Sequence, residues 1–289
     1  MNGILLVDKP QGWTSHDVVA KLRGVLGERR IGHSGTLDPM ATGLLVVFLG
    51  RATRAVQFAE AHEKTYLADM RTGIVTDTQD ITGEVLKTSG IRPKREELLS
   101  VLPEFTGELM QLPPMYSAVK INGQRLYKLA RNGVEIQRQP RPITIGELSL
   151  LGEGEGDFSL RIRCSKGTYI RTLVNDIGEK MGCGAALSSL RRITSGDFSI
   201  SQAYTLEQII QAAEESRAEG LLLPVDSLFS LYPPLSVNDE QLKKCLCGSS
   251  VPIAEPDGEY RFYAPDGSFL LLGSVCGGVM TTVKSFFEV

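Results

Sequence analysis

The stretch Gly32-His33-Ser34-Gly35-Thr36-Leu37-Asp38-Pro39-Met40-Ala41-Thr42-Gly43 decides how the rest of this chain is organised. Its three glycines and its proline exclude a long helix or an ordinary strand, and they indicate a loop. The next six residues, 44–49, are all apolar and predict a fully buried strand. A loop attached to a buried strand is held by the core while its side chains stay accessible, and catalytic groups are common in such loops. Asp38, the carboxylate of this loop, is therefore the first candidate for chemistry.

A structural role explains the same residues. Asp-Pro is common in turns, because Asp bonds its own backbone and Pro presets φ. His33 could likewise be a turn residue or a partly buried packing group. The loop by itself does not decide between the two interpretations.

Length and composition predict a globular protein. The 289 residues are enough for one large or two modest domains, and 42% hydrophobic with 22% charged residues is a globular composition. The net charge of −3 gives no global sign of a polyanionic partner. No run approaches the ~20 apolar residues of a membrane span, and the N-terminus lacks the basic start of a signal peptide. We therefore expect a soluble, cytoplasmic protein.

The sequence predicts neither a metal nor a cofactor. The five cysteines form no paired CxxC framework, and the spacing of Cys245 and Cys247 does not suit a zinc ribbon. No HExxH, phosphate-binding GxxxxGK[ST], GxSxG or dinucleotide fingerprint is present. If the protein is an enzyme, we expect it to work without either group.

Apolar spacing predicts short strands that alternate with helices. Thr14 or Ser15 is expected to begin the first helix and Gly27 to end it, while Thr168 and Thr205 are expected to cap two later helices. Strands are predicted over 4–7, 44–49, 63–70, 143–151, 158–164 and 186–193, and helices over 15–26, 54–61, 95–102, 126–131, 168–180, 205–213 and 239–246.

Two turns connect predicted strands. Asn122-Gly123 lies between strand residues and is the strongest hairpin signal in the chain. The glycine-rich stretch 152–156 superficially resembles a phosphate-binding loop, but no helix follows it and its two glutamates would repel phosphate. A plain hairpin loop is the better interpretation.

Basic residues are concentrated between positions 117 and 145, a segment that contains six of them and one glutamate. Tyr116 and Tyr127 lie among these charges, an arrangement that suits a nucleic-acid backbone with bases available for stacking. The alternative is a solvated surface that serves solubility. The basic residues are Lys120, Arg125, Lys128, Arg131, Arg138 and Arg141.

A second cluster, 165–173, lies where a strand is expected to meet a helix. Tyr169 and Arg171 would project there past the end of the sheet. Arg is suited to bidentate pairing with a carboxylate, so Arg171 could hold and aim Asp38. The alternative is a solvated residue in the first helical turn.

Seven motifs in order resemble those of the bacterial tRNA pseudouridine-55 synthases, the TruB family, over the chain to about residue 228. One such motif is weakly specific, but seven in sequence are very specific. The motifs are Asp8-Lys9-Pro10-x-Gly12-x-Thr14-Ser15, the loop 32–43, Lys64-x-Tyr66, Thr76-Asp77-Thr78-x-Asp80, Leu112-Pro-Pro-x-Tyr116-Ser-Ala, Lys166-Gly-Thr-Tyr169-Ile-Arg171-x-Leu173 and Leu190-Arg191-Arg192.

The resemblance implies isomerisation of a uridine in the T loop of tRNA to pseudouridine, without metal or cofactor. Asp38 matches the catalytic aspartate, Tyr66 the tyrosine that stacks on the target base and assists deprotonation at C5, and Arg171 the arginine that pairs with the aspartate. Such chemistry requires the nucleotide to be flipped out of its stack. Whether Asp38 attacks C6 or C1′, or abstracts the 2′ proton, stays open.

Further residues match positions that contact the RNA. Tyr169 and Leu190 match pocket-lining positions, and His33 matches the histidine that contacts the displaced T-loop bases. The segment 111–145 corresponds to the RNA-gripping insertion, which we expect to be mobile before RNA binds. Its expected RNA-binding residues are Lys120, Arg125, Lys128, Arg131 and Arg141.

The resemblance also implies an α+β fold with a mixed, largely antiparallel sheet. Residues 1–228 would form the catalytic domain. Residues 229–289 would form a small, mostly β, PUA-like domain, which is a weak RNA-binding surface because it has four basic and seven acidic residues. We expect a monomer that needs no protein partner.

Other functions remain possible. The same basic hairpin would serve a non-catalytic RNA-binding protein or a tRNA folding chaperone. A guide-RNA-dependent subunit is disfavoured because the chain lacks long basic tails. A carboxylate-based hydrolase lacks an obvious second catalytic carboxylate, since Asp77 and Asp80 are interpreted as turn residues.

Overall fold

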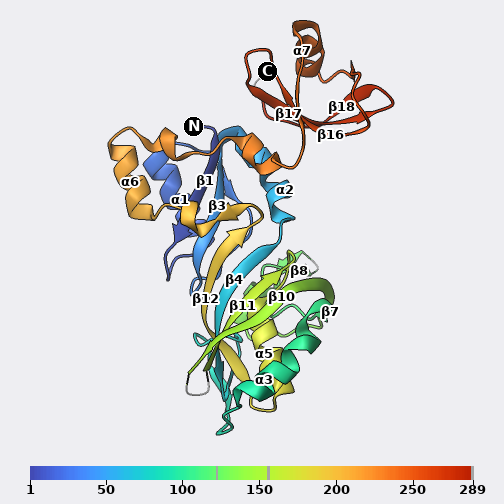
Figure 1. Ribbon diagram of the computed structural model, residues 1–289. Helices are drawn as coiled ribbons and strands as arrows, with labels where there is room; N and C mark the ends of the chain where they lie inside the picture. The colour runs from blue at the N-terminus through green and yellow to red at the C-terminus, as the bar shows by residue number, and fades with distance from the viewer. Residues whose placement is uncertain (122, 155–156, 288–289) are drawn as a thin grey trace.

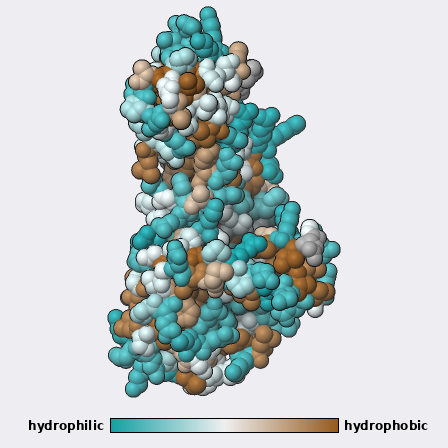
Figure 2. Space-filling model, turned by 90° about the vertical axis from the view of Figure 1, so that its right-hand side faces the viewer, coloured by the Kyte–Doolittle hydropathy of each residue, from teal (hydrophilic) through white to brown (hydrophobic). Residues whose placement is uncertain are grey.

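The computed structural model describes residues 1–121, 123–154 and 157–287. The molecule is elongated, with a nine-stranded sheet in its larger part and a five-stranded sheet at one end (Figure 1). Seen from the side, the end with the smaller sheet is narrower than the rest (Figure 2). Within the described residues, no helix has the length and apolar character to cross a membrane.

The larger sheet has the strand order β1-β3-β12-β4-β11-β10-β7, with β2 added to β3 and β13 to β12. Only the β3–β12 pair within this order is parallel. The expected mixed, largely antiparallel sheet is confirmed. Its strands are β1 (Gly3–Lys9), β2 (Ile31–His33), β3 (Thr42–Leu49), β4 (Lys64–Thr72), β7 (Gly107–Gln111), β10 (Arg141–Glu153), β11 (Asp157–Cys164), β12 (Ala185–Ser195) and β13 (Phe198–Ser199).

The apolar run 44–49 in β3 is buried on both faces of the sheet. Leu44, Val46 and Phe48 pack toward the 3-10 helix η1 (Gly50–Ala55) and α2 (Val56–Glu60). The alternate side chains, 45, 47 and 49, pack against α1 (Ser15–Leu26) and α6 (Leu206–Glu214). A strand covered on both faces has no exposed face on which to alternate polar residues, which explains the unbroken apolar pattern.

The ends of α1 follow the predicted signals. The Thr14 hydroxyl accepts a hydrogen bond from the Asp17 backbone N–H at 3.0 Å, and the Asp17 carboxylate accepts one from the Thr14 N–H at 2.9 Å. Gly27 ends the helix with φ 63°, a conformation that glycine adopts without steric cost. Thr205 begins α6 with the same reciprocal pair of bonds.

The other half of the sheet is covered by α5 (Ile170–Lys180) and α3 (Arg95–Val101), which lie together on one face (Figure 1). The expectation that Thr168 caps α5 is wrong. Thr168 bonds to the Ser165 carbonyl at 3.0 Å, and Tyr169 occupies the N-cap position without a side-chain cap. The Gln111 side chain instead accepts from the Tyr169 N–H at 2.8 Å and donates to its carbonyl at 3.0 Å. A residue far away in sequence thus fixes this helix start.

The segment between β7 and β10 contains the predicted hairpin and short helix. The hairpin strands are β8 (Lys120–Ile121) and β9 (Gln124–Arg125), and α4 (Leu126–Arg131) follows directly. Asn122, the first residue of the predicted turn, lies outside the described residues. The loop predicted over 152–156 is partly wrong, because residues 152 and 153 belong to β10 and pair with the antiparallel strand β11. Positions 155 and 156 lie outside the described residues.

The remaining elements form a small hairpin, several 3-10 helices and the second sheet. In that sheet the order is β14-β16-β17-β18-β15, and it contacts the larger part through aromatic rings of Phe229, Phe269 and Phe286. It is consistent with a PUA-like domain. The elements are β5 (Ile74–Thr76), β6 (Val85–Thr88), η2 (Leu102–Phe105), η3 (Ile200–Gln202), η4 (Ala218–Leu221), η5 (Val225–Phe229), β14 (Pro234–Ser236), α7 (Asp239–Leu246), β15 (Val251–Pro252), β16 (Gly258–Tyr263), β17 (Phe269–Cys276) and β18 (Val279–Ser285).

Candidate active site

The backbone around Asp38 is held in place by the start of α1. The buried Ser15 hydroxyl accepts from the Leu37 N–H at 2.8 Å and donates to the Leu37 carbonyl at 3.2 Å. The Asp38 carbonyl accepts from the Ala41 N–H at 3.0 Å. The Asp38 side chain is 38% exposed. The loop backbone is therefore held in place, and the Asp38 carboxylate is partly exposed to solvent.

The end of this loop requires a glycine. Gly43 pairs with Arg192 where β3 and β12 run parallel, and its φ is +98°. A Cβ at this position would lie 2.3 Å from the Arg192 carbonyl oxygen, which is far inside van der Waals contact. The absence of a side chain lets the two strands approach and sets the loop against β12.

Arg171 reaches Asp38 from the first turn of α5. Its Nε lies 2.9 Å from Asp38 Oδ2. Its other two nitrogens donate to the carbonyls of Thr78 and Tyr116, each at 2.7 Å, and Nη1 lies 3.7 Å from Asp80 Oδ2. Arg171 is 5% exposed, so the guanidinium is a fixed part of the interior. The structure thus joins two residues that the sequence paired only as a hypothesis.

Tyr66 and Leu190 lie on strands of the larger sheet, in a buried cluster with residues of the loop 32–43. They lie on the neighbouring strands β4 and β12 and share a buried cluster with Leu37 and Met40 of the loop. Burial raises the pKa of Tyr66, and the positive charge of Arg192 acts against that rise. The Tyr66 ring and the Leu190 side chain thus share a buried cluster with residues of the loop that carries Asp38.

Tyr169 and His33 come from two different elements, the start of α5 and the end of β2. Burial raises the pKa of Tyr169, which precedes Arg171 at the start of α5. His33 is the last residue of β2, and burial lowers its pKa, so the ring is neutral at pH 7. In the part of the chain that the structure describes, the buried His33 Nδ1 has no hydrogen-bond partner.

The predicted RNA-binding residues of the insertion are exposed. Lys120 and Arg125 pair across the β8–β9 hairpin, and the Arg131 guanidinium lies 5.5 Å from the centre of the Tyr127 ring. Lys128 and Arg141 are also exposed. In the described part of the chain, Asp38 pairs with Arg171 and with none of these exposed cations.

Three buried cations were not predicted as parts of the site. Lys9 is fully buried and donates to the Trp13 carbonyl at 2.6 Å, and burial lowers its pKa to about 8. Lys64 donates to the His62 carbonyl at 2.6 Å, and burial likewise lowers its pKa to about 8. Arg192 is 1% exposed and bonds the carbonyls of Leu44 at 2.6 Å and Gly35 at 3.1 Å. All three belong to the sequence motifs that resemble the family, and that membership was the signal that could have pointed to them.

Asp77 and Asp80 are turn residues, as interpreted from the sequence. One Asp80 oxygen accepts from the Thr82 N–H at 2.9 Å and from the Thr78 hydroxyl at 2.8 Å. Asp77 accepts from the Glu84 N–H at 2.8 Å. Among the described residues no group of three His, Cys, Asp or Glu side chains is arranged to hold a metal ion.

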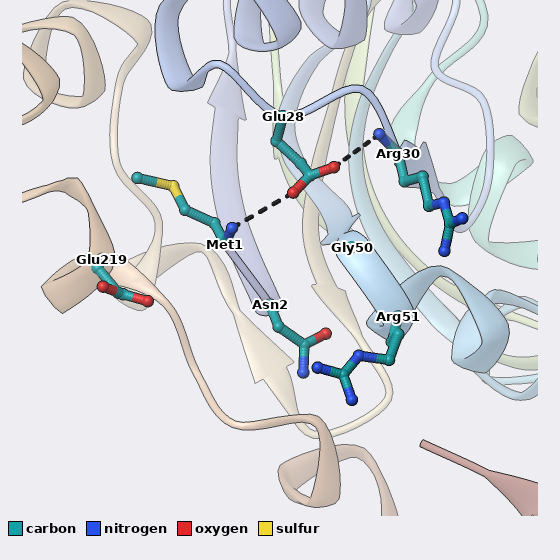
Figure 3. A pocket seen from close by; sticks show the side chains of 7 residues that line it. All are labelled: Met1, Asn2, Glu28, Arg30, Gly50, Arg51 and Glu219. Atoms are coloured by element: carbon teal, nitrogen blue, oxygen red, sulfur yellow. Dashed lines mark hydrogen bonds and ion pairs between the residues drawn. The ribbon is translucent and has the colours of Figure 1, made fainter. Parts of the chain in front are cut away.

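A surface hollow of about 380 Å³ lies elsewhere, at the N-terminus (Figure 3). In it the Met1 ammonium lies 3.3 Å from Glu28 Oε2, and the other Glu28 oxygen accepts from the Arg30 N–H at 2.9 Å. Its lining contains none of the candidate catalytic residues. Asp38 lies elsewhere, in the loop 32–43. Leu37 and Met40 of that loop share a buried cluster with side chains of the larger sheet.

Comparison with known proteins finds two family models that together match residues 23–230. Residues 23–170 match the model described as TruB family pseudouridylate synthase, N-terminal domain. Residues 171–230 match the tRNA pseudouridylate synthase B C-terminal domain. The second match ends before β14, so neither model includes the second sheet.

Similar proteins cover most of the chain. The tRNA pseudouridine synthase B of Clostridium kluyveri is 40% identical over 279 residues, which are 94% of this chain and 95% of that protein. The tRNA pseudouridine synthase B of Syntrophotalea carbinolica is 49% identical over 245 residues, 84% of this chain and 80% of that protein. The likeness therefore includes most of the second sheet in the first case.

The fold is also similar to a solved structure, a Cbf5-Nop10-Gar1 complex. One of its chains superposes with a TM-score of 0.75 and 26% identity, over 99% of this chain and 85% of that chain. Both sheets are included in this superposition, because the coverage leaves out almost none of the residues.

Proposed function

Because the chain belongs to the TruB family of tRNA pseudouridine synthases, which are isomerases, we propose that it converts uridine 55 in the T loop of tRNA to pseudouridine. The observation that carries the proposal is the ion pair of 2.9 Å between Arg171 Nε and the partly exposed Asp38. A single oriented carboxylate next to an aromatic ring is what the reaction requires from the protein.

We propose that Asp38 acts on a uridine flipped into the site. The bond between N1 and C1′ breaks, the base rotates, and a bond between C5 and C1′ forms. The proton on C5 leaves, and N1 gains a proton, so the product is an isomer of the substrate. Tyr66 replaces the stacking that the base loses when it is flipped, and its hydroxyl assists removal of the C5 proton.

Arg171 keeps the Asp38 carboxylate in place throughout. The three short contacts of its guanidinium leave it no freedom to rotate. Tyr169 and Leu190 line the pocket for the base in this proposal. His33, whose lowered pKa keeps it neutral, contacts the T-loop bases that flipping displaces.

In this proposal the two parts of the chain have different roles. Residues 1–228 carry the reaction, and the insertion, about 111–145, grips the phosphate backbone through its exposed basic residues. Residues 229–289 form the PUA-like domain and add a weak tRNA contact. One chain suffices without a protein partner, because Asp38, Tyr66 and Arg171 all come from it, and the enzyme works in the cytoplasm, where it meets tRNA.

Mapping of modified uridines in an unmodified tRNA transcript tests this function. The purified chain should produce pseudouridine at position 55 and at no other uridine. Asp38→Asn should bind the transcript with unchanged affinity but form no product, because the amide keeps the size of the side chain and lacks the charge. Turnover retained in Asp38→Asn, or modification at another position, would refute the proposal.

A tRNA folding chaperone is a second candidate, because the exposed basic insertion does not depend on Asp38 for its structure. The Asp38→Asn protein should then still speed the folding of a misfolded tRNA transcript. Equal folding rates with and without this variant would exclude that role.

A further inference from the structure

Tyr116 connects the insertion to the candidate catalytic pair. Its carbonyl accepts a hydrogen bond of 2.7 Å from Arg171 Nη2. Its side-chain hydroxyl donates to Asp77 Oδ2 at 3.1 Å. Asp77 lies in the same turn as Thr78, whose carbonyl accepts from Arg171 Nη1 at 2.7 Å. Tyr116 is therefore fixed at two points, by Arg171 itself and by the turn that also supplies the Thr78 acceptor of Arg171.

The acceptor of the Tyr116 hydroxyl is rigid. The other Asp77 oxygen accepts from the Glu84 N–H at 2.8 Å, and the Asp77 N–H donates to the Glu84 carbonyl at 3.1 Å. The hydrogen bond to Asp77 raises the pKa of Tyr116, so its hydroxyl stays protonated and able to donate. The hydrogen bond thus attaches the half-buried Tyr116 ring to a turn that two hydrogen bonds to Glu84 hold in place.

The backbone next to Tyr116 carries the insertion. The Ser117 carbonyl accepts from the Tyr127 N–H at 3.1 Å, and the Val119 carbonyl accepts from the Leu126 N–H at 2.9 Å. Leu126 is fully buried. A shift of the β8–β9 hairpin or of α4 therefore reaches the peptide group of Tyr116 through one residue.

We propose that Tyr116 is a positioning residue, through which the insertion sets the orientation of Arg171 and hence of Asp38. The Tyr116 carbonyl faces Nη2, and this contact helps the guanidinium to keep Nε on the Asp38 carboxylate. Without the bond to Asp77 the Tyr116 ring is free to shift, and its backbone carbonyl shifts with it. The inference rests on the proposed function, because its effect is measured as the rate of pseudouridine formation.

Tyr116→Phe tests the inference. The substitution keeps the ring and the backbone carbonyl and removes only the bond to Asp77. We expect the single-turnover rate at saturating tRNA to fall about tenfold, because small misplacements of a catalytic group are costly. The Kd for tRNA should change by less than about twofold, which separates positioning from binding. A parental rate in Tyr116→Phe would overturn the inference.

Substitutions of Asp77 distinguish positioning from loss of structure. In Asp77→Asn the amide oxygen still accepts from Glu84 and the amide N–H donates to the Tyr116 hydroxyl oxygen, so we expect a rate near that of the parent. Asp77→Ala should be as slow as Tyr116→Phe, and the double variant no slower than Asp77→Ala alone. A rate in Asp77→Asn as low as in Asp77→Ala, or fully additive losses, would contradict the inference.

Tyr260→Phe is the matched control. It removes a hydroxyl that donates to the Pro256 carbonyl at 2.9 Å in the second sheet, and we expect no change in rate. The parent protein measured in the same assay separates the proposed function from the role of Tyr116. No product from the parent refutes the proposed function, whereas product from the parent with equal rates in all variants refutes only the role of Tyr116.

Discussion

Replacement of Arg171 by lysine isolates the contribution of the forked guanidinium, since it keeps the positive charge. Arg171 makes three short contacts in three directions, to Asp38 at 2.9 Å and to the carbonyls of Thr78 and Tyr116 at 2.7 Å each. A lysine ammonium is a single point charge and cannot reproduce this geometry. The variant therefore cannot keep all three hydrogen bonds in their present directions.

The structure sets the expected magnitudes. Removing a hydrogen bond to a charged group costs roughly 1.5–3 kcal/mol, but Asp38 is 38% exposed, so water replaces part of what it loses. We expect the free energy of unfolding to fall by about 2–4 kcal/mol. The rate should fall by about 100-fold, because a carboxylate free to turn is rarely in the reactive position. The Kd for tRNA should stay within about threefold, since Arg171 is 5% exposed and out of reach of phosphates.

The assay follows the proton that leaves C5. A tRNA transcript with tritium at C5 of its uridines releases the label when the new bond forms, and an excess of enzyme reports a single turnover. Urea denaturation gives the free energy of unfolding. Arg163→Lys is the control, because Arg163 forms an exposed ion pair of 2.7 Å with Glu63 that is worth at most about 1 kcal/mol. A rate in Arg171→Lys within about threefold of the parent, together with lower stability, would refute the catalytic role of the guanidinium fork.

Three further outcomes are expected. Gly43→Ala should lower the free energy of unfolding by about 3 kcal/mol, against about 1 kcal/mol for Gly27→Ala. Both glycines have positive φ, but of the two only Gly43 lies against another backbone segment. Equal losses of the two variants in urea denaturation would contradict the close approach of β3 and β12. Burial lowers the pKa of His33 below 6.5, so the folded chain binds fewer protons than the unfolded one and stability falls as the pH drops through that value. His33→Gln should flatten this fall between pH 7 and pH 5, and an unchanged slope would show that the ring is not buried in its neutral form. Replacing Arg125 and Lys128 by glutamine should weaken tRNA binding and reduce the slope of log K against log salt by about 0.7–0.9 for each phosphate that is no longer neutralised, whereas an unchanged slope would place the phosphates elsewhere.

Local sequence patterns determined most of the elements. The unbroken apolar run 44–49 predicts a buried strand because both faces of β3 are covered, by α1 and α6 on one side and by η1 and α2 on the other. Thr14 and Gly27 mark the two ends of α1, since capping depends on side chains a few residues away. The order of the motifs also identified the family, because each motif is readable without knowledge of the fold. The roles of Asp38, Tyr66 and Arg171 stay predictions that the experiments above test.

Tertiary structure alone decided which distant groups meet. Thr168 has the right chemistry for a cap, yet Gln111 from another strand fixes the start of α5. Arg192 has no recognisable local role in the sequence. The parallel pairing of β12 with β3 buries its guanidinium against the carbonyls of Gly35 and Leu44. These two residues precede and follow Asp38 in the sequence. A side chain's neighbours along the chain set its backbone preference, whereas its partners across the sheet depend on strand order and register. Those two properties follow from how all the strands bury their faces together, and no single stretch of sequence contains them.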